Sequence, residues 1–79
     1  MKLPRNLNGV VLAKSLVSNW NYVQIHQTGS HIILDTEEPS HQRIAIPAHK
    51  SLRVGTLNNI LKSVANHKQI SRQEILDKL

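Results

Sequence analysis

The spacing of the apolar residues changes from helical to alternating near residue 21, and this change most restricts the possible folds. Residues 9–18 place apolar side chains at a helical period, and Asn8 before them is a residue type that caps helix N-termini. We therefore predict a first helix whose apolar stripe consists of Ala13, Leu16, Val17 and Trp20. Asn21 suits the helix exit, because asparagine tolerates the left-handed conformation.

Residues 22–46 follow the alternating period of strands. Residues 22–27 predict a half-buried strand with Val23 and Ile25 on its inner face, and residues 31–35 predict a second strand. The tight connection at 28–30 indicates that the two strands form a hairpin. Residues 36–42 are typical of an exposed loop. A short third strand, 43–46, is expected to end at Pro47, which cannot donate to a ladder.

The remaining residues return to helical spacing. A basic loop at 48–55 is expected to lead into a second helix capped by Thr56, with an inner stripe of Leu57, Ile60, Leu61 and Val64. Residues 71–74 read Ser-Arg-Gln-Glu, a capping box that predicts a short C-terminal helix. The order predicts an α+β fold with an antiparallel sheet, helices on one sheet face, and the other face open. A chain of 79 residues supports one small core, so we expect residues 1–79 to form one domain.

Charge and composition restrict the partners. Ten Lys and Arg oppose five Asp and Glu, and no acidic residue occurs between Glu38 and Glu74. This excess predicts a polyanionic partner, most often nucleic acid, although plain solubilising charge explains it equally well. The absence of cysteine excludes disulfides and thiolate metal sites. The longest apolar run, 10–13, is far too short to span a membrane and Lys14 interrupts it, so we expect a cytoplasmic protein without a membrane or signal segment.

Five histidines raise the question of a metal site or an acid–base site. Their spacing matches no known metal motif, so we expect neither a metal nor another cofactor. His31 follows Gly29 and Ser30, and strand alternation places it on one face with Ile33 and Asp35. Imidazole changes charge near neutral pH, which makes His31 a candidate acid–base group. The alternative is an inert surface histidine.

Two motifs together resemble the HicA-type (YcfA-like) toxins. The first is Gly-Ser-His at 29–31. The second is Ile-Ala-Ile-Pro-Ala-His at 44–49, followed by Gly-Thr-Leu-Asn-Asn-Ile-Leu-Lys at 55–62. The resemblance extends from about Leu7 to the C-terminus, and it departs from the family pattern at Asn21, Thr28 and Asn58. It implies a double-stranded-RNA-binding-domain-like α–β–β–β–α fold. It also implies ribosome-independent cleavage of mRNA with His31 as the active residue, and a HicB-type antitoxin that masks this histidine.

RNA cleavage would also need residues near His31 that stabilise the phosphate and hold the RNA. Ser30 and backbone amides at the Gly29 turn can donate hydrogen bonds to a phosphate. The candidates for holding the RNA backbone are Arg43, Lys50, Arg53 and Lys62. Two alternatives remain, a non-catalytic RNA-binding module of the same fold and an inactive relative that acts only as a partner protein. The two aromatic residues are too few for the base-stacking platform of an RNA-recognition motif or an OB-fold.

Overall fold

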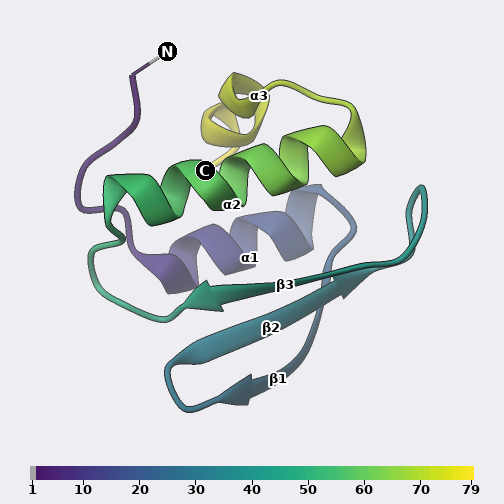
Figure 1. Ribbon diagram of the computed structural model, residues 1–79, viewed down its shortest axis with the longest axis horizontal. Helices are drawn as coiled ribbons and strands as arrows, with labels where there is room; N and C mark the ends of the chain where they lie inside the picture. Colours follow the sequence, from purple (N-terminus) through teal and green to yellow (C-terminus); the bar gives the residue numbers. More distant parts are fainter. Residues whose placement is uncertain (1) are drawn as a thin grey trace.

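The helices and strands follow the predicted order. A computed structural model describes residues 2–79. The elements are α1 (Gly9–Asn19), β1 (Val23–Thr28), β2 (His31–Thr36), β3 (Gln42–Pro47), α2 (Val54–Lys68) and α3 (Arg72–Asp77). Figure 1 shows α1 and α2 on one side of the three strands, with α3 over the middle of α2 on the side away from the strands. The α+β prediction with a short extra C-terminal helix is therefore confirmed.

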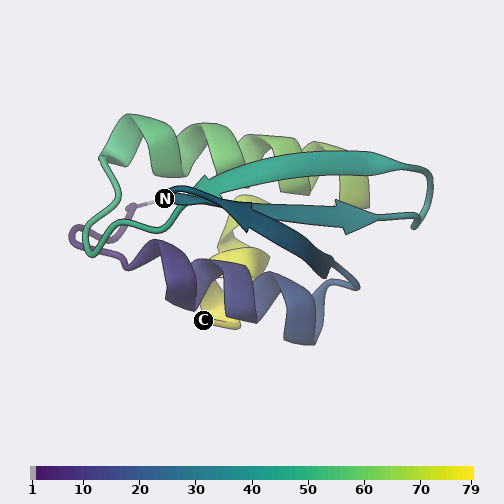
Figure 2. The same ribbon diagram turned by 90° about the horizontal axis from the view of Figure 1, so that it is seen from below.

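The sheet has one covered face and one open face. Its strand order is β1-β2-β3 with both pairs antiparallel, so β2 is central. Ile32, Leu34 and Thr36 of β2 are buried, whereas the alternate side chains from His31 to Asp35 are not. Seen from below, the strands cross the space between α1 and α2 (Figure 2). The predicted face containing His31, Ile33 and Asp35 is the face turned away from the helices.

The core lies between the sheet and the helices, and α2 contributes the stripe that the sequence predicts. Leu57, Ile60, Leu61 and Val64 are all buried. In α1 the predicted Ala13 and Leu16 are buried and Trp20 packs against the core, but Val17 is 41% exposed and Leu12 is fully buried instead. Helical spacing in this segment fits two overlapping stripes, and the packing of Gly9 and Leu12 selects the other one.

The prediction for β1 is wrong in its inner face. Val23 and Ile25 are 59% and 46% exposed, and every residue of β1 is exposed. β1 is an edge strand, and its register shifts between Gln24 and His26, so alternation along it does not define one buried face. Tyr22, just before the strand, is the residue that enters the core, with 1% of its surface exposed.

Three of the four predicted helix-terminus features are confirmed. Asn8 caps α1 by accepting from the amides of Val10 and Val11, and Asn21 has a φ of 61°. Ser71 and Glu74 form the predicted capping box of α3. Thr56, however, does not cap α2. The helix begins at Val54, and the Arg53 carbonyl accepts from the amide of Leu57, so Thr56 already lies inside the first turn.

Burial of Tyr22 predicts a loss of stability at alkaline pH. Its hydroxyl donates to Oε1 of Gln42, and burial raises the pKa of Tyr22 to about 12. A tyrosine in the unfolded chain ionises near pH 10. The neutral phenol therefore stabilises the fold fully below about pH 10, and this contribution is lost as the pH rises from about 10 through about 12. Because the chain has one tyrosine, ultraviolet titration of tyrosinate alongside circular dichroism measures it directly.

The control for this prediction is Tyr22→Phe. Lys68, whose Nζ lies 4.8 Å from the centroid of the Tyr22 ring, acts in the opposite direction because desolvation lowers its pKa. The phenylalanine variant keeps Lys68 and loses only the ionisable hydroxyl. Its unfolding free energy should decline less between pH 10 and 12 than that of the wild type. Equal declines in the two chains would contradict a role for Tyr22.

Candidate functional site

The β1–β2 turn presents His31 at the start of the central strand. Thr28 pairs with His31 across the turn, and Gly29 has a φ of 58°, a conformation that side chains disfavour. A Cβ on Gly29 would meet no atom within 4 Å, so its backbone conformation, and not crowding, is the reason for glycine here. The tight connection predicted at 28–30 is therefore confirmed, with Gly29 and Ser30 forming its two-residue loop.

His31 is exposed on the open face and has strand neighbours on both sides. Thr28 of β1 and Pro47 of β3 are its direct cross-strand partners. Two other histidines are held by hydrogen bonds. Nδ1 of His41 lies 2.7 Å from Oε2 of Glu37, and Nε2 of His67 lies 2.8 Å from the Ser40 carbonyl oxygen. His31 is thus placed where its imidazole is open to a ligand from solvent.

The residues that follow β3 lie beside the Gly29–Ser30 turn, next to His31. The amide of Ala48 donates to the Ser30 carbonyl at 2.6 Å, one step beyond the last strand pair. The amide of Gly9 donates to the His49 carbonyl at 2.9 Å, which fixes the start of α1 against this segment. The loop is tied further along, where the amide of Leu52 donates to the Leu7 carbonyl at 2.8 Å. Backbone hydrogen bonds from three parts of the chain therefore hold the surroundings of His31.

Arg43 lies at the opposite end of the open face. It pairs with Asp35 through two hydrogen bonds, of 2.7 Å from Nε and 3.0 Å from Nη2. These bonds to Arg43 hold the pKa of Asp35 below its usual range. Asp35 is four residues along β2 from His31, so Arg43 stands well away from the turn and already has an anionic partner.

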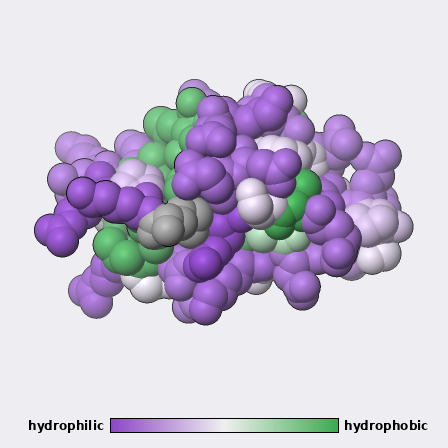
Figure 3. Space-filling model, turned by 90° about the horizontal axis from the view of Figure 1, so that it is seen from above, coloured by the Kyte–Doolittle hydropathy of each residue, from purple (hydrophilic) through white to green (hydrophobic). Residues whose placement is uncertain are grey.

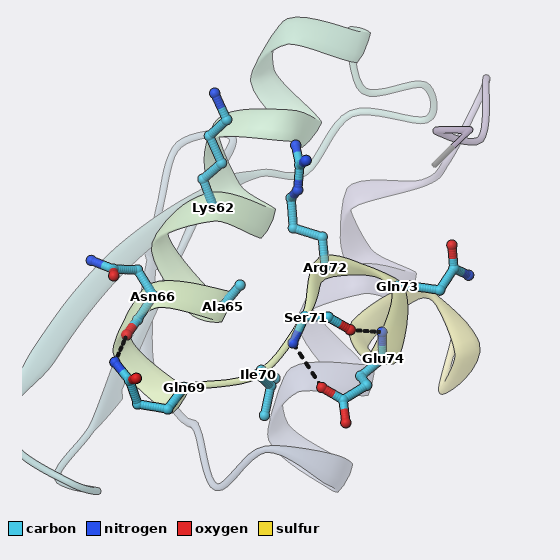
Figure 4. A pocket seen from close by; sticks show the side chains of 9 residues that line it. All are labelled: Lys62, Ala65, Asn66, Gln69, Ile70, Ser71, Arg72, Gln73 and Glu74. Atoms are coloured by element: carbon cyan, nitrogen blue, oxygen red, sulfur yellow. Dashed lines mark hydrogen bonds between the residues drawn. The ribbon is translucent and has the colours of Figure 1, made fainter.

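The other predicted cations lie in two separate places. Lys50 and Arg53 are exposed in the loop that begins beside Ser30. Lys62 is on α2 and lines a groove between α2 and α3 together with Arg72, and Figure 4 shows the two side chains extending in the same direction. This groove belongs to the helical layer. Figure 3, which views the molecule from above, shows that the outer surface of this layer is mostly hydrophilic. The structure thus brings Gly29, Ser30 and His31 together, puts Lys50 and Arg53 in the neighbouring loop, and separates Lys62 from them.

The sequence prediction did not include the proximity of Ala48 and His49 to the turn. It ended the third strand at Pro47 and treated the following residues as a connecting loop. The signal was available in the hairpin arrangement, because a ladder that pairs His31 with Pro47 brings Ser30 to Ala48 if it continues one more step.

Two further properties bear on the kind of protein. Among residues 2–79, no group of three or more His, Asp or Glu side chains is arranged to hold a metal ion. None of the helices in this described part combines the length and the apolar character needed to cross a membrane.

Comparison with known proteins identifies the family. A model of the family described as HicA toxin of bacterial toxin-antitoxin matches residues 14–65. No curated protein and no solved structure matches the chain. The matched segment is more than half of the chain and includes all three strands, the Gly29–Ser30 turn, His31 and most of α2. The chain therefore belongs to the HicA toxin family, and as a toxin of a toxin–antitoxin system it has an antitoxin as its partner.

Proposed function

We propose that the chain is an endoribonuclease that cleaves mRNA in the cytoplasm and uses His31 as an acid–base group. The observation that carries this proposal is the position of His31, exposed at the start of the central strand beside the Gly29–Ser30 turn. Family membership supports it, because the resemblance in the Gly-Ser-His motif implies mRNA cleavage at this histidine.

The chemistry requires little beyond a positioned imidazole. The 2′-hydroxyl of RNA attacks the adjacent phosphorus, a new O2′–P bond forms, and the P–O5′ bond breaks. A base must take the 2′ proton, and an acid must protonate the leaving 5′ oxygen. The Ser30 hydroxyl and backbone amides at the turn are proposed to donate hydrogen bonds to the negatively charged phosphorane oxygens. We propose that this reaction needs no metal, because the nucleophile belongs to the substrate.

Phosphate contacts are proposed to hold the RNA. Lys50 and Arg53 are the best placed of the four predicted cations, because their loop begins at the hydrogen bond between Ala48 and Ser30. Arg43 is paired with Asp35, and Lys62 lies in the helical layer. These two residues are therefore proposed to contact only phosphates of the RNA that lie far from the cleavage site. The antitoxin is proposed to be of the HicB type and to cover His31 on the open face, where an acidic surface would complement the net charge of +5.

Two RNA substrates and a chelator test the proposal. The purified chain should cut unmodified mRNA in the presence of EDTA and leave fragments that end in a 2′,3′-cyclic phosphate. The same sequence with 2′-O-methyl riboses should stay intact, because its nucleophile is blocked. Binding of both RNAs without cleavage of either would instead establish the non-catalytic RNA-binding alternative. Cleavage that stops with EDTA and resumes with a divalent cation would contradict the metal-free reaction.

A further inference from the structure

The chain runs extended beyond β3 as far as His49. The Ala48 amide points toward β2, where it bonds to Ser30 at 2.6 Å, whereas the His49 carbonyl points away from β2 toward Gly9. The Pro47 carbonyl is turned to the same side, because a Cβ built on Gly9 would lie 1.9 Å from its oxygen. Residues 47 and 49 thus face Gly9 while residue 48 between them faces β2, and this alternation is that of an extended strand.

This extension places His49 on the open face with His31. Alternation puts the side chains of Pro47 and His49 on the same face, and Pro47 is the direct cross-strand partner of His31. His49 is therefore a diagonal neighbour of His31, and the Cα atoms of such neighbours lie about 7–8 Å apart. Both side chains are exposed. One phosphodiester fits between two imidazoles at this separation.

His26 is the other histidine on the open face, and it lies on the opposite side of β2 from His49, away from Lys50 and Arg53. It pairs with Ile33, two residues further along β2 than His31. It is thereby a diagonal neighbour of His31 on β1, toward the middle of the face, whereas Lys50 and Arg53, the cations proposed to hold the RNA, follow His49 in the chain. His49 is instead fixed at the His31 end by the hydrogen bond between its own carbonyl and the amide of Gly9.

We propose that His49 is a second catalytic residue, which forms an acid–base pair with His31 across the scissile phosphate. This inference rests on the proposed ribonuclease function. One imidazole, in its neutral form, takes the proton of the 2′-hydroxyl as the O2′–P bond forms. The other, in its protonated form, gives a proton to the 5′ oxygen as the P–O5′ bond breaks. The products are a 2′,3′-cyclic phosphate and a free 5′-hydroxyl, and the proton count balances between the two rings.

The charged side chains that follow His49 in the loop are basic, and the carboxylate on β2, Asp35, lies at the other end of the face, where it pairs with Arg43. Lys50 directly follows His49, Arg53 lies four residues beyond His49 in the same loop, and both are exposed, while His31 is the ionisable side chain of β2 at this end. Lys50 and Arg53 favour the approach of an RNA phosphate to the pair. Histidine is the residue type that serves as either base or acid near neutral pH, which suits both positions of such a pair.

The test compares His49→Ala, His49→Gln and His31→Ala on two substrates across a range of pH. One substrate is an ordinary oligoribonucleotide. The other carries sulfur in place of the bridging 5′ oxygen at one phosphate, so its leaving group needs no protonation. On the ordinary RNA both His49 variants should cleave at least about 100-fold more slowly than the wild type. The sulfur substrate should restore most of the lost rate in either the His49 variants or the His31 variant, but not in both.

The pH profile separates a catalytic role from a structural one. The wild type should give a bell-shaped profile, and the His31 and His49 variants should each lose one limb, on opposite sides. His26→Ala, a change on the same face, serves as the matched control and should keep both limbs. Normal cleavage by the His49 variants, or slow cleavage with both limbs intact, would overturn the inference while leaving His31 in place. A wild type that cleaves neither substrate would overturn the proposed function itself.

Discussion

Expression of the His31→Ala chain without antitoxin is expected to leave growth and mRNA intact, whereas the wild type arrests growth and degrades mRNA. The imidazole is the group proposed to move a proton in the cleavage step, and loss of one such group lowers a rate about 10²–10⁴-fold. His31 is exposed and lies outside the buried core, so the variant should unfold at the same temperature as the wild type. Growth curves, transcript integrity and thermal unfolding of both chains measure these outcomes.

Two controls make the His31 experiment specific. His41→Ala removes an exposed histidine near the opposite end of the sheet, where its Nδ1 lies 2.7 Å from Glu37, and should remain fully toxic. Binding of the His31 variant to RNA should stay within severalfold of the wild type, because the phosphate contacts are proposed to come from other residues. If the His31 and His41 variants are equally toxic, or both are harmless, His31 is not the active residue.

Gly9→Ala is expected to be the most destabilising of the three Gly→Ala changes. The added Cβ would lie 1.9 Å from the Pro47 carbonyl oxygen and 3.4 Å from a methyl carbon of Leu52. The first contact is with backbone, so α1 or the end of β3 must move, and the Gly9–His49 hydrogen bond would be strained. Overpacking of this kind costs about 1–3 kcal/mol of unfolding free energy. In a domain of this size each kcal/mol lowers Tm by about 4–8 °C.

Gly55→Ala is the matched control for this prediction. Gly55 also lies in the first turn of a helix, but a Cβ there would meet no atom within 4 Å. Removing its backbone freedom in the unfolded chain should stabilise the fold by about 0.4–1 kcal/mol. Thermal and urea unfolding of the two variants should therefore shift in opposite directions. Equal shifts would mean that the approach of Gly9 to Pro47 does not limit the packing.

The sequence predicted the fold most reliably where local chemistry and packing act together. The α2 stripe and the capping box at Ser71 follow from residues whose spacing permits one solution. The predicted α1 stripe holds at Ala13, Leu16 and Trp20 but includes Val17 in place of Leu12, because the apolar residues fit two overlapping faces and the packing of Gly9 against Pro47 cannot be read from the sequence. Burial in β1 could not be predicted from alternation, because its place at the edge and its shifted register depend on the neighbouring strand.

For the candidate site, too, the sequence predicted some features and could not predict others. The exposed position of His31 follows from a glycine turn and strand alternation, both visible in the sequence. The grouping of the cations does not, because it depends on tertiary contacts. The pairing of Arg43 with Asp35 requires the β2–β3 register, and the distance of Lys62 from the turn requires the packing of α2 on the covered face.

The ion pair between Asp35 and Arg43 makes the electrostatic potential of the open face uneven along the strands. It neutralises one cation at the end where Glu37 and Glu38 also lie, while Lys50 and Arg53 remain uncompensated near His31. The potential along the sheet therefore rises from the Asp35 end toward the turn. A polyanion that approaches this face is drawn to one end and repelled from the other, so long-range forces align an RNA strand before any base is contacted.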